Sequence, residues 1–273
     1  MPRKQKTRKD PPKPRFPVPL QPTAQTAPPK LARCPGTLVA VHLGGLASCG
    51  MLAGLSETGQ VPAQILTPDT GSEERSSDRH REEMAGWLRR VGFPSAVRCR
   101  RAGKYASLES ECRERERVPV PGGLIGGCDR EWKRAPVEEA FAKKWAGTPA
   151  RLAFPLPWEE RHRAAEVELG SSVPLWFPLV AWAWTLDDCR AACARQGVPT
   201  PVRPGCFLCP CRRPAEVSAL SGAELSRAVA IEVAAKVPLG NGWAWSAHLN
   251  ARPAAPLELA APPAPPAWCR GTA

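Results

Sequence analysis

The sequence predicts a mostly α-helical protein with a large disordered fraction, short helices and no well-defined globular fold. Leu, Val, Ile and Phe make up 51 of the 273 residues, about 19%, which falls just below the level of about 20% that is typical of disordered, highly charged chains. Prolines number 33, and each one lacks the backbone donor that a helix or a central strand needs. The formal net charge of +12 adds self-repulsion.

The first segment, residues 1–33, is expected to be a disordered, basic, proline-rich arm. Residues 1–56 carry nine Lys and Arg but a single acidic residue, so most of the positive charge lies here. Such an arm attracts acidic proteins or nucleic acid without choosing between them. Arg8, Pro11 and Pro14 also fit the spacing that SH3-type domains accept. The partner stays unknown, and no small-molecule substrate is evident.

The second segment, residues 34–129, is expected to hold short helices and glycine-rich turns. It begins with an uncharged stretch in which Thr37–Leu43 reads as a short buried strand followed by a glycine turn. A membrane span over residues 37–55 is the less favoured alternative, because His42 and the glycines lower the hydropathy. The sequence PGGLIGG at 121–127 matches neither G-x-G-x-x-G nor the P-loop pattern, so it is interpreted as a flexible turn.

Six stretches carry helix signals such as capping residues, acids in the first turn, bases in the last turn and a terminal glycine or proline. The clearest of these stretches begins with the capping-box pair Ser221 and Glu224 and is followed by Pro238. The predicted helices cover Ser72–Arg90, Glu109–Arg117, Pro136–Gly147, Trp158–Gly170, Thr185–Gly197 and Ser221–Val237.

The third segment, residues 130–249, is the candidate ordered part, helical and rich in Trp and Cys. Cys189 and Cys193 lie four residues apart, on one face of the helix predicted after Thr185. Cys206 and Cys209 form a C-x-x-C pair that is typical of a metal knuckle. The four cysteines are the candidate zinc ligands, and the competing interpretation is a set of free thiols, with no cofactor. Residues 250–273 are expected to be a disordered, low-complexity Pro/Ala tail.

No catalytic motif is found, so we do not expect an enzyme. The histidines are isolated in sequence, and H-E-x-x-H, G-x-S-x-G and nucleotide-loop patterns are absent. No specific function is assignable: the sequence favours at most a non-enzymatic interaction protein with exposed tryptophans, and its bias toward GC-rich codons suits a weakly selected reading frame. The alternative is a small zinc-stabilised nuclear or nucleic-acid-binding module. With no signal peptide in the sequence, an intracellular location, nuclear or cytoplasmic, is expected.

Overall fold

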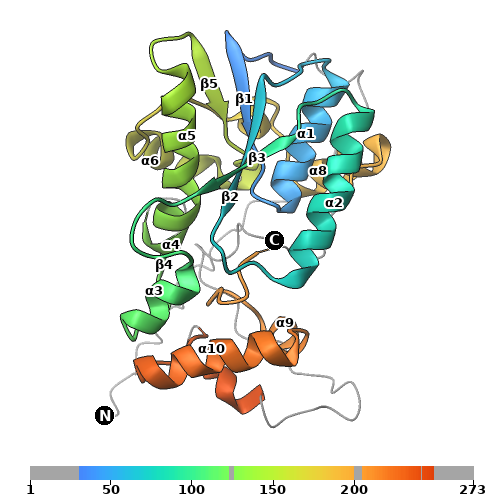
Figure 1. Ribbon diagram of the computed structural model, residues 1–273. Helices are drawn as coiled ribbons and strands as arrows, with labels where there is room; N and C mark the ends of the chain where they lie inside the picture. Colours follow the sequence, from blue (N-terminus) through green and yellow to red (C-terminus); the bar gives the residue numbers. More distant parts are fainter. Residues whose placement is uncertain (1–30, 123–125, 200–204, 241, 249–273) are drawn as a thin grey trace, which may run out of the picture. The chain divides into compact units, whose positions relative to one another are not determined.

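A computed structural model of the chain contains a five-stranded parallel β-sheet with helices on both faces (Figure 1). It describes residues 31–122, 126–199, 205–240 and 242–248. The prediction of a mostly α-helical, largely disordered chain is therefore wrong, because the protein has an α/β fold. The arm up to residue 30 and the tail from residue 250, both predicted to be disordered, lie outside the described residues.

The order of the strands across the sheet is β3-β2-β1-β5-β6. The chain therefore builds outward from β1 to β3 and then returns to the other side of β1, which is a doubly wound arrangement. The strands are β1 (Thr37–Val41), β2 (Gln64–Asp69), β3 (Ala96–Arg100), β5 (Ala150–Ala153) and β6 (Leu175–Trp176).

One face of the sheet is covered by three helices that share a hydrophobic core with Leu38 and Ala40 of β1. The closest approach is between the first and the last of them, where a Cβ placed on Gly50 would lie 2.3 Å from the Cβ of Cys189. Only glycine permits this contact. These helices are α1 (Leu46–Glu57), α2 (Arg75–Arg90) and α8 (Leu186–Gln196).

The opposite face holds Val39 and Val41, the alternate residues of β1, as the pleat of a strand requires. They pack with apolar side chains of α5, such as Phe141, and with Val167 of α6. The elements of this side are the π-helical turn η1 (Arg130–Arg134), α5 (Ala135–Trp145), the 3-10 turn η2 (Trp158–Arg163) and α6 (Ala164–Leu169).

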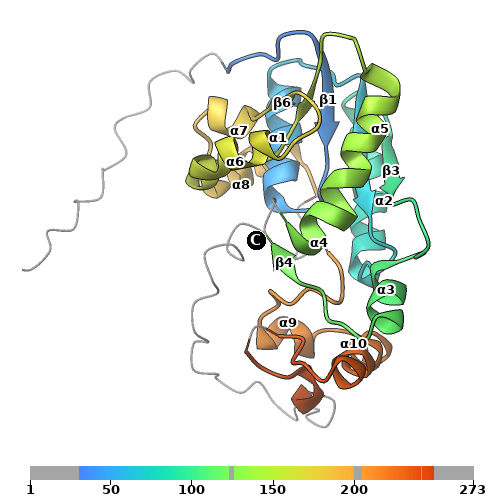
Figure 2. The same cartoon turned by 90° about the vertical axis from the view of Figure 1, so that its left-hand side faces the viewer.

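A third cluster of helices lies beyond the carboxyl ends of the strands (Figures 1 and 2). Its core contains Trp132, Phe207 and Trp245, all of them fully buried. The amide of Arg75 in α2 donates to the Glu224 carboxylate at 3.0 Å, which ties the cluster to the sheet. Its elements are α3 (Leu108–Glu114), α9 (Pro214–Ser218), α10 (Gly222–Ala235) and the 3-10 turn η3 (Trp245–His248).

The remaining short elements connect these layers. They are β4 (Pro121–Gly122), α4 (Gly127–Asp129) and α7 (Pro178–Ala181). The turn predicted at 121–127 spans β4 and the start of α4, and its residues 123–125 lie outside the described part of the chain.

The local helix predictions are largely confirmed. Thr185 and Ser221 cap α8 and α10 through complete capping boxes, and Gly197 ends α8 in the left-handed conformation. The stretch after Trp158 starts as a 3-10 turn before it becomes α6.

The fold class was wrong because the composition count left out the residues that fill this core. Ala, Cys and Trp side chains supply much of the buried apolar surface, among them Ala53, Cys193 and Trp87. The sheet was missed because strands buried on both faces show no polar alternation. β2 also contains Pro68, which lies past the last residue paired with β1, where no ladder donor is required on that side.

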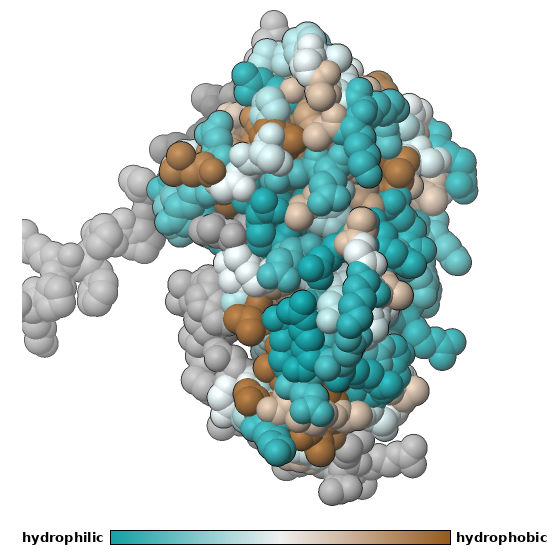
Figure 3. All heavy atoms as spheres, turned by 60° about the vertical axis from the view of Figure 1, so that its left-hand side comes forward, coloured by the Kyte–Doolittle hydropathy of each residue, from teal (hydrophilic) through white to brown (hydrophobic). Residues whose placement is uncertain are grey.

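The visible face in Figure 3 is largely hydrophilic, with hydrophobic residues in small groups. None of the nine tryptophans among the described residues is exposed, so the expectation of exposed tryptophans is wrong. In the described part of the chain, no helix has the length and apolar character needed to cross a membrane. Most of the uncharged stretch at 37–55 forms β1 and the first ten residues of α1 instead.

Candidate functional site

A cavity of about 150 Å³ opens at the carboxyl ends of β1, β2 and β5. The helix that follows β1 covers one face of the sheet, and α6, which follows β5, covers the other. The chain therefore diverges between these two strands and leaves a crevice at the switch point. This is the place where doubly wound proteins bind their ligands.

The floor of this pocket is the turn from β1 into α1, which contains Gly44 and Gly45. Gly44 has a φ of +80°, which favours glycine. Gly45 is the N-cap of α1, so the N-cap residue has no side chain to bond the first amides, and the first turn contains no acidic residue. A Cβ on Gly45 would meet no atom within 4 Å, so the space above the turn is open. The first amides of a helix have no acceptor within the helix, and here the positive end of its dipole faces the cavity.

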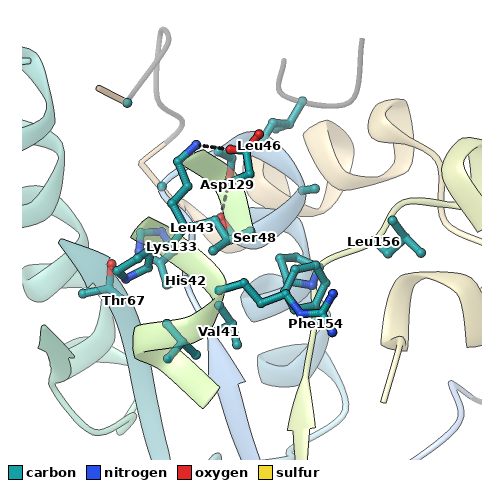
Figure 4. A pocket seen from close by; sticks show the side chains of 18 of the residues that line it. Val41, His42, Leu43, Leu46, Ser48, Thr67, Asp129, Lys133, Phe154 and Leu156 are labelled. Carbon is teal, nitrogen blue, oxygen red and sulfur yellow. Dashed lines mark hydrogen bonds and ion pairs between the residues drawn. The ribbon is translucent and has the colours of Figure 1, made fainter. Parts of the chain in front are cut away.

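Charged side chains line one side of the pocket. Lys133 of η1 pairs with Asp129 of α4 at 2.7 Å (Figure 4). Burial alone lowers the pKa of Lys133, but the neighbouring Asp129 carboxylate outweighs it and leaves that pKa above its usual value. The ammonium group is therefore charged at neutral pH. The paired Asp129 carboxylate, which lines the same pocket, balances this charge.

The other side of the pocket combines apolar side chains with one unsatisfied acceptor. Phe154 and Leu156, from the segment after β5, lie across the pocket from His42 and Thr67 (Figure 4). Glu160 pairs through one oxygen with Arg163 at 2.5 Å. Its Oε1 is buried and has no hydrogen-bond partner within the described structure. A ligand hydroxyl or amino group can supply that missing donor.

A compact group of three potential metal ligands forms the rear wall. The Cys49 Sγ lies 3.8 Å from the Nε2 of His42 and 3.8 Å from the Nε2 of His80. His42 follows β1, Cys49 belongs to α1 and His80 belongs to α2, and all three are buried. Within the part of the chain that the structure describes, no other group of three or more His, Cys, Asp or Glu is so compact, with all ligand atoms within 4.8 Å.

Burial sets the protonation of this group. It lowers the pKa of His42 to about 3, with a further contribution from His80. The pKa of His80 is also lowered by burial. Burial and the neighbouring cysteines raise the pKa of the Cys49 thiol. Both imidazoles are therefore neutral at neutral pH, the form in which histidine binds metals.

The four cysteines predicted to bind zinc lie in two separate places. Cys189 and Cys193 are buried in the core between α1 and α8, where they raise the pKa of Cys49. Cys206 belongs to the core beneath α10, and with Cys209 it lines a smaller cavity of about 50 Å³. The structure thus brings each pair together but not the two pairs. One pair lies beside the group formed by His42, Cys49 and His80.

In the sequence, the glycines after Thr37–Leu43 indicated a simple turn, and nothing marked His42 as a ligand. The sequence contained one signal of a site: a buried strand is followed by a Gly-Gly pair and then by an uncharged stretch. His80 lies 38 residues after His42, and only folding places their ring centroids 5.9 Å apart.

No family model matches this chain, and a search of curated proteins finds no match. The fold and the site geometry therefore carry the functional argument.

Proposed function

We propose that the pocket binds a nucleoside phosphate, with the phosphate groups against the turn formed by Gly44 and Gly45. The observation that carries this proposal is the uncapped N-terminus of α1 at the switch point between β1 and β5. A helix N-terminus supplies backbone donors and a positive dipole, both of which suit phosphate. The fold places this terminus where doubly wound proteins bind nucleotides.

The rest of the pocket suits the other parts of such a ligand. Lys133 lines the same cavity as Gly44 and Gly45. Its ammonium group can pair with a negatively charged phosphate there. Phe154 and Leu156 offer an apolar wall for a base. The unsatisfied Oε1 of Glu160 is an acceptor for a ribose hydroxyl or a base amino group.

The turn differs from two common phosphate-binding loops. Gly44 and Gly45 are adjacent, so the spacing of G-x-G-x-x-G is absent, and so is the Gly-Lys-Ser/Thr of the P-loop. Neither motif therefore identifies the nucleotide, and the proposal rests on the helix terminus and its place in the fold. The interaction-protein and nucleic-acid-binding hypotheses concern mainly the basic arm, which lies outside the described residues, and they stay predictions.

Isothermal titration calorimetry with ATP, ADP, AMP, adenosine and pyrophosphate tests the proposal. We expect the phosphorylated nucleosides to bind and adenosine to bind at least about tenfold more weakly, because it lacks the charged group that the turn recognises. Gly45→Leu should abolish binding, since its side chain enters the open space above the turn.

Gly222→Leu is the matched control. Gly222 opens α10, and a Cβ there also meets no atom within 4 Å, but it lies outside the pocket. Failure of every nucleotide to bind the wild-type chain would overturn the proposal, and so would equal binding by both variants.

A further inference from the structure

We propose that His42, Cys49 and His80 bind a single Zn²⁺ ion in the rear wall of the pocket. In tetrahedral zinc coordination, the usual bond lengths place a sulfur and a nitrogen ligand about 3.6 Å apart. The two Sγ-to-Nε2 distances here are both 3.8 Å. All three ligand atoms lie within 4.8 Å of one another, so an ion can lie between them after small side-chain movements.

The donor types select the class of metal. Two imidazoles and a thiolate suit zinc and related transition metals. Magnesium and calcium prefer oxygen ligands, and no carboxylate belongs to this compact group among the described residues. The three ligands come from the end of β1, from α1 and from α2, so the fold itself holds them at this spacing.

The site has an open side. His42 and His80 line the cavity, whereas Cys49 lies behind them, with its Sγ 3.7 Å from the carbonyl oxygen of Pro199. Catalytic zinc sites have three protein ligands and a fourth position that faces a cavity. Water or a substrate atom occupies that fourth position. The fourth position here faces the pocket. The metal site rests on its own three ligands and does not require that the pocket bind nucleotides.

Behind the site, Cys193 and Cys189 lie close enough to influence Cys49 electrostatically. Zinc bound by His42, Cys49 and His80 would therefore lie beside two of the four cysteines that the sequence predicted as ligands. The other two cysteines of that set, Cys206 and Cys209, line the smaller cavity together with Cys128. A variant of Cys209 thus separates the two assignments.

The test uses the full chain, reduced, freed of metal with a chelator and titrated with Zn²⁺ and Co²⁺. We expect one metal per chain by elemental analysis. Co²⁺ should give the visible absorption bands of a tetrahedral site and a near-ultraviolet thiolate charge-transfer band. Cys49→Ser should remove the charge-transfer band and weaken binding by more than the about 10–100-fold that second-shell changes give.

His80→Gln is a second ligand variant, at a residue that lines the cavity, and should weaken binding in the same way. Cys209→Ser should bind as the wild type does. Circular dichroism of each variant shows whether it is folded, so weak binding by a folded variant counts for the proposal. Absence of stoichiometric metal in the wild type would overturn it. So would loss of binding in Cys209→Ser with retention in folded Cys49→Ser.

Discussion

The helices α1 and α10 have similar lengths, 12 and 14 residues, but their N-termini are capped differently. The N-terminus of α10 is closed by its own chain, since Ser221 and Glu224 exchange capping hydrogen bonds. The N-terminus of α1 has a glycine N-cap with no side-chain bond and no acid in its first turn. Helix ends left without partners cost stability. The difference indicates that local hydrogen bonds close the N-terminus of α10, whereas the N-terminus of α1 is left for the ligand that we propose.

The two helices also differ in how they are buried. Nearly every residue of α1 from Leu46 to Leu55 is buried, and its glycines allow α8 and Trp182 to approach closely. By contrast, α10 buries one side and leaves residues such as Val233 exposed. Tertiary contacts therefore stabilise α1, and local capping contributes much more to α10.

The largest expected effect comes from filling the contact between α1 and α8. In Gly50→Leu the new Cβ would approach Cys189 to 2.3 Å, and backbone would have to move. We expect a loss of at least about 3 kcal/mol in the free energy of unfolding, at the upper end for overpacking. Urea denaturation measures it.

Gly222→Leu in α10 is the matched change and should alter stability by less than about 1 kcal/mol. Similar losses in the two variants would mean that the close contact does not distinguish the helices.

The second effect concerns the carboxylate of Glu232 in α10, which accepts hydrogen bonds from the segment after the helix. Glu232 accepts hydrogen bonds from the backbone amides of Leu239, Trp245 and Ser246 at 2.8, 2.8 and 3.0 Å. Glu232→Gln removes the charge and turns an amino group toward these donors. We expect a loss of about 2–3 kcal/mol at pH 7.

The loss should depend on pH. Burial alone raises the pKa of Glu232, but the three backbone donors outweigh it and lower that pKa below its ordinary 4.5. The contribution is therefore complete above the unfolded-state value and disappears as pH falls through the folded-state value. Unfolding free energies measured from pH 7 to pH 3 should show the wild type approaching Glu232→Gln below pH 4.5. A difference that stays constant over this range would contradict the assignment.

The smallest effects are expected from substitutions that remove the N-cap side chain of α10 and give one to α1. Ser221→Ala should cost α10 about 1 kcal/mol, the usual value of an N-cap. Gly45→Asp supplies α1 with an acidic cap, and its backbone at φ −96° and ψ 172° suits that role. We expect it to stabilise the ligand-free protein by up to about 0.5 kcal/mol and to abolish nucleoside phosphate binding.

Thermal unfolding and calorimetry measure the two properties separately. Gly45→Asn is the uncharged control, which should keep the cap and repel phosphate less. Tighter nucleotide binding by Gly45→Asp than by Gly45→Asn would show that the turn does not hold an anion.

Elements whose stabilising hydrogen bonds are local could be predicted from the sequence alone. The capping boxes at Thr185 and Ser221 and the left-handed Gly197 lie within a few residues of the bonds that they make, so pattern and structure agree. Helix α1 gave no such signal, because its N-cap is a glycine without a side-chain bond, and the close approach at Gly50 is explained only by Cys189 of α8, more than 130 residues away.

The sheet and the site depend instead on contacts between segments that are distant in the sequence. Parallel pairing joins β1 to β5 across more than 100 residues, and no local pattern records such a partner. The same pairing places the Gly44–Gly45 turn at a switch point, and the packing of α1 and α2 brings Cys49 to His42 and His80. Local hydrogen bonds can be predicted from neighbouring residues, but contacts between distant segments depend on the energy of the whole fold.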